Sequence, residues 1–241
     1  MLEVSEVTGG YGDIVVVDGL TLRCPDNYVT VVLGPNGAGK TTALRLVMGL
    51  LKPMKGEVRF DGKPLGSLPA HKRAEMGMCL IPEGRSIFPS LTVRDNLVVQ
   101  AAPGQEESGI AEVIAAFPAL EFRLNQRAGT LSGGEQRMLG LARVYMQKPR
   151  LVLIDEPSLG LAPIIVDRIF EFLHGLASSN VALLVVEQYA ERALAFADYV
   201  YVLGGGRVQL EGTPDDVRRN DLLAAYITGS GTTADGGYNG G

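Results

Sequence analysis

The sequence predicts an α/β fold with a core of mainly parallel β-sheet, an N-terminal antiparallel β subdomain and a helical insertion in the core. Continuous apolar runs, such as residues 151–155, are typical of parallel strands that are buried on both faces. Stretches in which apolar residues recur at helical spacing follow such runs. Between about residues 83 and 150 only helical periodicity recurs, which indicates that this part of the chain is inserted as a helical block.

Periodicity and turn residues define the order of the elements. Strands are predicted at residues 2–8, 14–24, 29–33, 57–60, 78–81, 151–155, 181–186, 199–203 and 207–210. Helices are predicted at residues 42–50, 69–75, 92–100, 108–117, 132–147, 163–178 and 189–197, and a last one begins at Pro214 with Thr213 as its cap. We therefore expect one domain over residues 1–228, with the helical insertion at about 83–150. Residues 229–241 are mostly small and polar, so we expect a disordered tail there.

Composition narrows the class of protein. The chain has 241 residues, of which 46% are hydrophobic, so it can bury a sizeable core. Its net charge of −5 argues against nucleic acid or an anionic membrane surface as the main partner. No signal-peptide pattern opens the chain, and no apolar stretch approaches the roughly 18 residues of a membrane span. Cys24 and Cys79 are interpreted as buried thiols, and a cytoplasmic protein is expected.

The most informative stretch is a glycine-rich loop between a predicted strand and a predicted helix. It consists of Gly34, Pro35, Asn36, Gly37, Ala38, Gly39, Lys40, Thr41 and Thr42, and it fits G-x-x-x-x-G-K-[ST]. Glycines let the backbone curl around a polyphosphate with its N–H groups pointing inward, and the helix N-terminus adds partial positive charge. Lys40 can reach the β- and γ-phosphates, and the hydroxyl of Thr41 can bind Mg²⁺. The loop therefore predicts binding of a nucleoside triphosphate such as ATP.

Two adjacent carboxylates stand at the carboxyl end of a buried run: Asp155 is the last residue of the run at 151–155, and Glu156 follows it. In open α/β sheets this carboxyl edge is where ligands bind. Asp155 can hold Mg²⁺ directly or through water, and Glu156 can polarise the water that attacks the γ-phosphate. The alternative is that Asp-Glu-Pro only ends a strand.

A third motif begins the helix predicted at residues 132–147. Ser132, Gly133, Gly134 and Glu135 leave several backbone N–H groups open at a helix start, which makes a second anion cradle. A capping box explains Ser132 and Glu135 equally well. It does not explain two glycines in the first turn, which cost roughly 1 kcal/mol each relative to alanine. We infer that the second cradle serves the nucleotide of a neighbouring subunit.

The phosphate loop, the signature Leu-Ser-Gly-Gly-Glu-Gln and the Asp-Glu-Pro motif, in this order, resemble the ATP-binding cassette family over residues 2 to about 227. The resemblance implies a P-loop NTPase core and a head-to-tail dimer with two ATP molecules between the subunits. It implies that Tyr11 stacks on adenine and that Ser158 lies in the loop that couples the two sites. It also implies that the signature contacts the partner's nucleotide, with Ser132 and Gly134 at its γ-phosphate.

Two positions depart from the family pattern. A glutamine that senses Mg²⁺ and the attacking water usually precedes the helical insertion, and here Glu83 stands in its place. A histidine that touches the γ-phosphate usually follows the strand predicted at residues 181–186, and here Gln188 stands there. Glu83 adds a hard oxygen ligand beside the metal. Gln188 can donate a hydrogen bond but carries no positive charge, so slower turnover is one expectation. A degenerate, weakly hydrolysing site is the alternative.

Both departures, with the segment from Pro157 to Pro163, resemble the LivF-type subgroup, the second ATPase subunit of branched-chain amino acid importers. The resemblance implies a homodimer in isolation, a heterodimer with a second ATPase in the complex, and separate permease subunits on the inner face of the cell membrane. Close relatives serve urea and short amides. A cassette that acts on nucleic acid or ribosomes usually has two cassettes or a long coiled-coil insert, and neither is found here. A purely regulatory module is a third class, against which Lys40, Asp155 and Glu156 argue.

Overall fold

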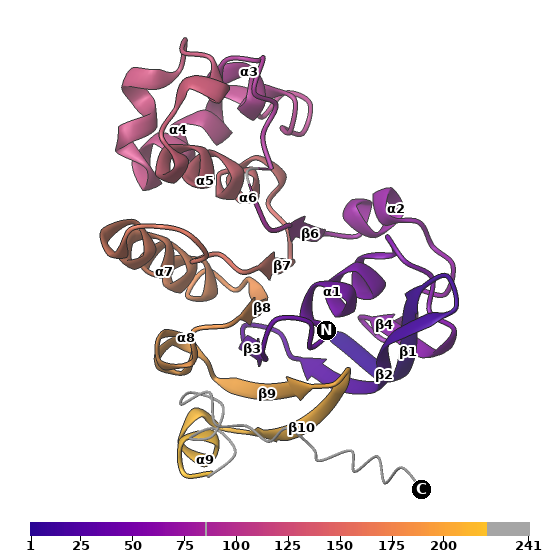
Figure 1. The fold of residues 1–241 in the computed structure, drawn as a ribbon. Coiled ribbons are helices and arrows are strands. Elements are labelled where there is room, and N and C mark those ends of the chain that lie inside the picture. The colour runs from indigo at the N-terminus through magenta and orange to yellow at the C-terminus, as the bar shows by residue number, and fades with distance from the viewer. Residues whose placement is uncertain (85, 221–241) are drawn as a thin grey trace, which may run out of the picture.

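The computed structural model describes residues 1–84 and 86–220, and two β-sheets organise them (Figure 1). The first is antiparallel, as predicted for the N-terminal part, with the order β2-β1-β4-β5. Its strands are β1 (Leu2–Tyr11), β2 (Ile14–Cys24), β4 (Lys55–Phe60) and β5 (Lys63–Pro64).

Strand β1 is longer than the predicted span of residues 2–8 because it continues through two glycines. Gly9 pairs with Val17 and Gly10 with Val15, across register shifts in the ladder. A Cβ atom on Gly9 would lie 2.6 Å from Leu46 Cδ2, so Leu46 would have to shift to admit a side chain there. A Cβ atom on Gly10 would lie 1.9 Å from the backbone carbonyl oxygen of Ile14, so this position needs glycine. These glycines therefore serve close packing in the structure.

The second sheet has six strands in the order β10-β9-β3-β8-β7-β6, and only the β9–β10 hairpin is antiparallel. This confirms the predicted mainly parallel core. Its strands are β3 (Val29–Leu33), β6 (Met78–Ile81), β7 (Leu151–Asp155), β8 (Ala182–Glu187), β9 (Tyr199–Gly204) and β10 (Arg207–Gly212). Parallel pairing brings the carboxyl ends of β3, β7 and β8 to one edge, so the loops that follow these strands are close together.

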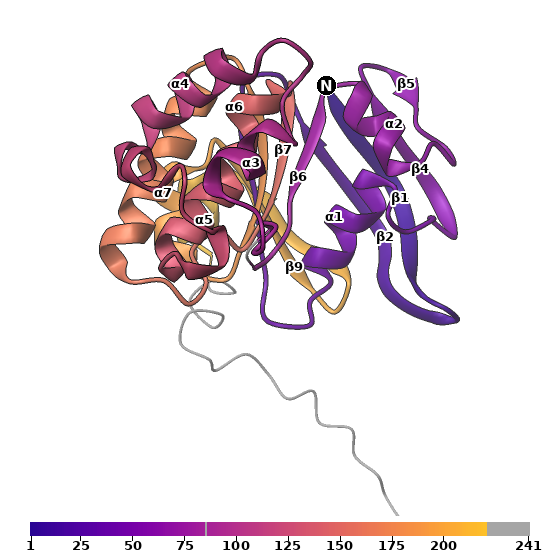
Figure 2. The same ribbon diagram turned by 90° about the horizontal axis from the view of Figure 1, so that it is seen from above.

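Helices cover both faces of the parallel sheet (Figures 1 and 2). Helices α1 (Lys40–Met48) and α2 (Ala70–Glu75) lie on the side of the antiparallel sheet, and α7 (Pro163–Ala177) and α8 (Ala190–Phe196) lie on the other side. Helix α9 (Pro214–Arg218) follows β10 and has the predicted Thr213 cap. Alternate side chains of β3 enter two separate apolar clusters: Val31 belongs to one and Val32 to the other. Burial on both faces fixes the strand that carries the phosphate loop.

Between β6 and β7 the described chain forms helices α3 (Val93–Val98), α4 (Glu106–Ala116), α5 (Gly133–Leu141) and α6 (Arg143–Gln147), with two short 3₁₀ turns. Figure 1 shows these helices grouped at one end of the molecule. The single helix predicted at residues 132–147 is divided at Ala142, where the carbonyl accepts from Tyr145 N–H in a tighter i→i+3 turn. The division of the chain into a domain at 1–228 with a subdomain at about 83–150 stays a prediction. The predicted tail at 229–241 lies outside the described residues.

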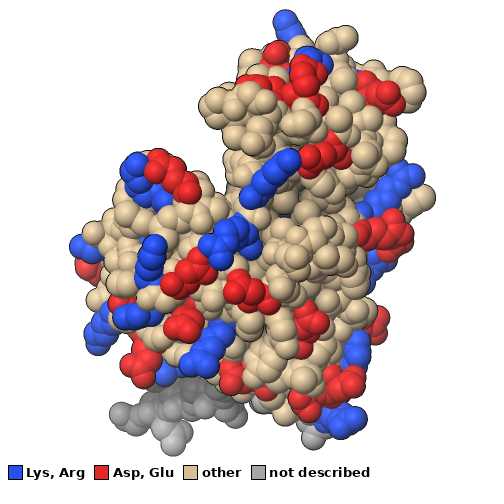
Figure 3. Space-filling view, turned by 180° about the vertical axis from the view of Figure 1, so that it is seen from behind, with Lys and Arg blue, Asp and Glu red and all other residues tan. Residues whose placement is uncertain are grey.

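Cys24 and Cys79 are buried free thiols, as predicted. Burial raises the pKa of Cys24 to about 12 and that of Cys79 to about 11, so neither is a reactive thiolate at neutral pH. Over residues 1–84 and 86–220, no helix has the length and apolar character needed to cross a bilayer. Acidic and basic side chains are interspersed on the face seen in Figure 3, so that face has no concentrated positive charge.

Candidate active site

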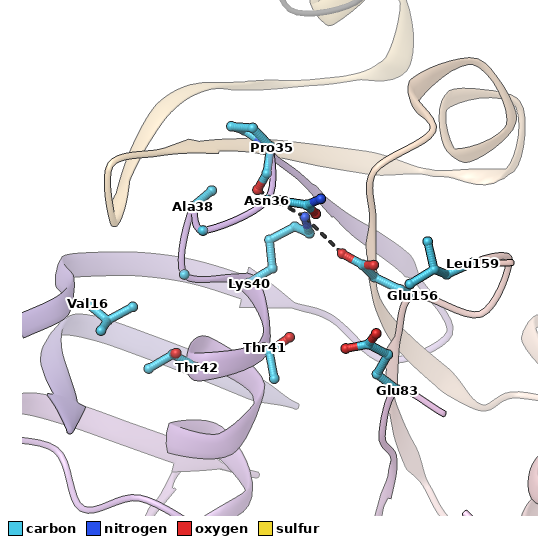
Figure 4. Close-up of a pocket in the computed structure, with 12 residues that line it drawn as sticks. Val16, Pro35, Asn36, Ala38, Lys40, Thr41, Thr42, Glu83, Glu156 and Leu159 are labelled. Carbon is cyan, nitrogen blue, oxygen red and sulfur yellow. Dashed lines mark hydrogen bonds and ion pairs between the residues drawn. The ribbon is translucent and has the colours of Figure 1, made fainter. Parts of the chain in front are cut away.

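The glycine-rich loop lies between the end of β3 and the start of α1 (Figure 4). Gly37 has a φ of 79° and Gly39 a φ of 100°, which is the left-handed region that favours glycine. Gly39 is also the N-cap of α1 and has no side chain to bond the first N–H groups of the helix. Those N–H groups can therefore hold an anion.

One pocket contains most of the loop together with two carboxylates from distant parts of the chain. It is lined by Val16, Pro35, Asn36, Gly37, Ala38, Gly39, Lys40, Thr41, Thr42, Glu83, Glu156 and Leu159. Figure 4 shows Glu83 and Glu156 on the side opposite Val16. Sequence reasoning missed Val16 and Leu159, because a lone aliphatic residue in a strand or loop has no chemical signal.

Lys40 is held among oxygen atoms at the centre of this pocket, with only 4% of its side chain exposed. Its Nζ atom donates to the carbonyls of Gly34 at 2.6 Å and Pro35 at 3.2 Å, and it forms an ion pair with Glu156 Oε1 at 3.0 Å. An ammonium group has three donors, so these contacts use all of them. The sequence placed both residues at the site but did not indicate that they touch.

Asp155 and Thr41 meet at the same edge of the sheet. The Thr41 hydroxyl donates to Asp155 Oδ1 at 3.0 Å, and Asp155 is buried. Burial raises the pKa of Asp155, and the nearby carboxylates of Glu156 and Glu83 act in the same direction. The Thr41 hydrogen bond and the Lys40 charge oppose this shift. The hydrogen bond from Thr41 and the charge of Lys40 therefore offset only part of the effect of burial on the Asp155 carboxylate.

Glu156 adopts an unusual backbone conformation directly after β7. Its φ is 44°, which is uncommon for a residue with a side chain. Its N–H donates to the Val186 carbonyl at 3.0 Å, so a hydrogen bond to β8 holds the turn. Such strained conformations persist where surrounding contacts fix them, and they cluster at functional sites.

Glu187, at the end of β8, was missed by the sequence analysis. It is buried, and its carboxylate accepts from the N–H groups of Ser158 and Gln188, each at 3.1 Å. Burial raises the pKa of Glu187, and these hydrogen bonds lower it. Its place directly before Gln188 was the only available signal. Glu187 thus fixes the backbone of both residues that the family resemblance singled out here.

The signature segment has its own capping box and does not line the pocket. Ser132 N–H donates to Glu135 Oε2 at 2.8 Å, and Glu135 N–H donates to Ser132 Oγ at 3.2 Å. Backbone hydrogen bonding from Ser132 is the main cause that lowers the pKa of Glu135. A Cβ atom on Gly133 would meet nothing within 4 Å, whereas one on Gly134 would lie 3.1 Å from Ile165. Packing within the chain therefore does not explain Gly133.

Tyr11 lies at the end of β1 and does not line the pocket. Its hydroxyl accepts from Arg45 Nη1 at 2.7 Å, and the residue is 42% exposed. Gln188 follows β8 directly and is likewise absent from the pocket lining. The stacking role of Tyr11 and the phosphate role of Gln188 stay predictions.

Comparison with known proteins agrees with this geometry. Residues 17–159 match the ABC transporter family. The chain is 39% identical to the high-affinity branched-chain amino acid transport ATP-binding protein BraG of Pseudomonas aeruginosa, over 95% of this chain and all of BraG. It is 34% identical to the probable branched-chain amino acid transport ATP-binding protein LivF of Archaeoglobus fulgidus, over 95% of this chain and 99% of LivF. BraF, a second branched-chain amino acid transport ATP-binding protein of P. aeruginosa, is 32% identical over 94% of this chain and 97% of BraF.

The fold is also similar to that of solved cassettes. The ATP-binding subunit of an ABC transporter superposes with a TM-score of 0.83 and 26% identity, over 95% of this chain and 98% of the other. Other solved structures that share the fold include dimeric cassettes.

Proposed function

The chain belongs to the ABC transporter family, and from this premise we propose that it is the ATP-hydrolysing subunit of an importer for branched-chain or other hydrophobic amino acids. The observation that carries the ATPase function is the common pocket of the phosphate loop and Glu156, with Lys40 between them. The proteins named BraG and LivF, which match nearly the whole chain, support the amino acid cargo. Urea or short amides are the alternative cargo.

In this proposal the loop from Gly34 to Thr42 binds the phosphates of ATP through backbone N–H groups and Lys40. Lys40 exchanges at least one of its present oxygen partners for a phosphate oxygen, since its three donors are already used. Glu156 then activates the attacking water as a general base. Gln188 donates to the γ-phosphate, and Tyr11 stacks on adenine at the open end of β1.

The residues beside the loop fit Mg²⁺. This cation binds through one or two carboxylates and the substrate phosphates and keeps several waters. Thr41 and Asp155 supply a hydroxyl and a carboxylate that already touch, and Glu83 faces the same pocket. The bound ion would neutralise charge on the transferring phosphoryl group.

A head-to-tail dimer completes the proposed site. The signature, Ser132 to Glu135, does not line this chain's own pocket, and Gly133 leaves space for close approach of another molecule. We place it on the nucleotide of the partner, with Ser158 in the loop between the two sites. BraF and BraG of one organism share a transport name, which supports pairing with a second, non-identical ATPase. Permease subunits would hold this dimer at the inner face of the membrane.

Reconstitution tests the function. The chain would be coexpressed with the permease, binding-protein and second ATPase genes that neighbour its own, and the complex would be placed in liposomes. We expect ATP-dependent uptake of leucine and valine that requires the lysine of the phosphate loop. Uptake of urea or acetamide in place of leucine would support the alternative cargo. ATP hydrolysis without any uptake would contradict the transport role.

A further inference from the structure

Arg137 lies on α5, directly after the signature Leu-Ser-Gly-Gly-Glu-Gln, and is 6% exposed. Its guanidinium group donates four hydrogen bonds, all to backbone carbonyls. Nη1 donates to Pro82 at 3.1 Å and Gly84 at 2.7 Å, and Nη2 donates to Asp155 at 3.0 Å and Glu156 at 3.1 Å. One side chain therefore joins three separate parts of the fold.

The four carbonyls belong to the segments that carry the carboxylates of the site. Pro82 and Gly84 flank Glu83, and the other two acceptors belong to Asp155 and Glu156 themselves. The planar fork of arginine can bridge acceptors on two sides, whereas the single ammonium of lysine cannot hold the same four at once. The geometry thus needs arginine and not merely a positive charge.

The guanidinium group of Arg137 is buried close to several carboxylates. Burial is the main cause that lowers the pKa of Arg137, and the nearby carboxylates of Asp155, Glu187 and Glu83 act in the opposite direction. Taking a guanidinium group out of water is costly unless its donors are satisfied. The turn after β7 is therefore held by two side chains. Arg137 donates to the carbonyls of Asp155 and Glu156, and the carboxylate of Glu187 accepts from the N–H of Ser158.

We propose that Arg137 is a positioning residue that links the signature helix to this chain's own carboxylates Glu83 and Glu156. The link rests on the proposed function, in which the start of α5 faces the partner's nucleotide. Closure onto that nucleotide would shift α5, and Arg137 would then carry the backbone of Glu83 and Glu156 with it. Each chain would thereby adjust its own hydrolytic site to the occupancy of the other.

The test compares Arg137→Met and Arg137→Lys with the same two changes at Arg143. Arg143, on α6, is a matched control because its guanidinium also donates to a backbone carbonyl, that of Leu80 at 2.8 Å, and to Gln100 Oε1 at 2.8 Å. Steady-state ATP hydrolysis would be measured against ATP concentration and divided by the number of nucleotide-binding sites found by titration. This normalisation removes any loss that comes only from unfolded protein.

We expect Arg137→Met to lower kcat per binding site by about 10- to 100-fold, the effect of a displacement of roughly 1 Å in a catalytic group. KM should change by less than about threefold, since the loop that binds ATP is not touched, and the Hill coefficient should fall to about 1. Arg137→Lys should be intermediate, and both Arg143 variants should keep kcat per site within about threefold.

Two results would overturn the link. If kcat per binding site falls equally in the Arg137 and Arg143 variants, Arg137 only stabilises the fold. If the parent has a Hill coefficient of 1, the two nucleotide sites do not communicate and the proposed link has no function. A parent that binds ATP but does not hydrolyse it would instead contradict the proposed function, and this is seen in the same assay before any variant is compared.

Discussion

The ammonium of Lys40 and the carboxylate of Glu156 form an ion pair 3.0 Å long in the pocket at the end of the parallel sheet. One group belongs to the phosphate loop and the other to the turn after β7, and both are nearly excluded from water. Opposite charges attract each other more strongly where water is excluded, because the effective dielectric constant is low. A phosphate group that enters the pocket must therefore compete with the Glu156 carboxylate for the Lys40 ammonium. The pair therefore connects nucleotide binding to the position of the proposed base.

Lys40→Ala should abolish ATP hydrolysis and strongly weaken ATP affinity, because it removes the charge that meets the β- and γ-phosphates. The same change leaves Glu156 buried without its cation, so the free energy of unfolding should fall by about 3–5 kcal/mol, the usual effect of breaking a buried pair. Nucleotide titration, an ATPase assay and urea unfolding measure the three effects. Lys52→Ala, at an exposed lysine, is the control. Hydrolysis at the parent rate in Lys40→Ala would disprove the phosphate-loop assignment.

Glu156→Gln should still bind Mg-ATP but trap a closed dimer, since the general base is lost while both anion cradles remain. The neutral amide also releases Lys40 from a charged partner, so ATP affinity should equal or exceed that of the parent. Light scattering with and without ATP would measure the mass. A variant that stays monomeric at high concentration and still turns over would rule out both the base and the dimer.

Asp155→Asn should stabilise the folded chain at high pH, because burial raises the pKa of Asp155 above its ordinary value of 3.8. A carboxyl whose pKa is higher in the folded state binds its proton more tightly there, so stability falls as the pH rises from 3.8 through the folded pKa. Each unit of such a shift corresponds to about 1.4 kcal/mol. Asparagine avoids this cost and keeps an oxygen for the Thr41 hydroxyl.

Urea unfolding without Mg²⁺, at steps from pH 8 down to pH 3.8, would measure the difference in the free energy of unfolding between variant and parent, because the change lies between pH 3.8 and the folded pKa. The difference should be greatest at pH 8 and shrink as the pH falls, while Asp26→Asn, at an exposed aspartate, should show no such trend. ATP hydrolysis should be lost at every pH. A constant difference across the range would show that burial of the charge does not destabilise the fold.

Local patterns predicted those features of the fold and site that depend on neighbours in the sequence. The parallel core, the capping box at Ser132, the Thr213 cap and strand 151–155 rest on periodicity and short motifs, and the structure has them. The extension of β1 through Gly9 depends on Leu46, which is distant in the sequence. Patterns within a strand cannot reveal such a contact.

The missed polar residues have the same cause. Arg137 bonds carbonyls more than 50 residues before it and 18 or 19 residues after it, and Glu187 bonds an amide 29 residues away. A carbonyl is present at every residue, so a side chain that binds carbonyls leaves no complementary residue type to find. Sequence reasoning identifies groups that carry chemistry, and it misses groups that position backbone.

Phe88 carries the last prediction, which concerns the permease. Its backbone is fixed from inside the helical block: its N–H donates to Asn96 Oδ1 at 2.7 Å and its carbonyl accepts from Asn96 Nδ2 at 3.0 Å. Asn96 is buried, whereas Phe88 is 51% exposed. The segment after Glu83 thus presents an aromatic ring to the outside on a rigid support, beside the partly buried Ile87. From the resemblance to the ATP-binding cassette family we expect this segment to line the groove that receives a cytoplasmic helix of the permease.

Phe88→Asp should therefore abolish coupling to the permease while the ATPase of the isolated chain stays within about twofold of the parent, since exposed substitutions usually change stability by about 0.5 kcal/mol or less. An aspartate placed against an apolar partner surface would be desolvated without a counter-charge, which is costly. Reconstituted leucine uptake, divided by basal hydrolysis, measures the coupling. Phe122→Asp, at a phenylalanine that is 87% exposed, controls for a new charge on the same block. Normal uptake by Phe88→Asp, or equal loss of uptake and hydrolysis through unfolding, would exclude the coupling role.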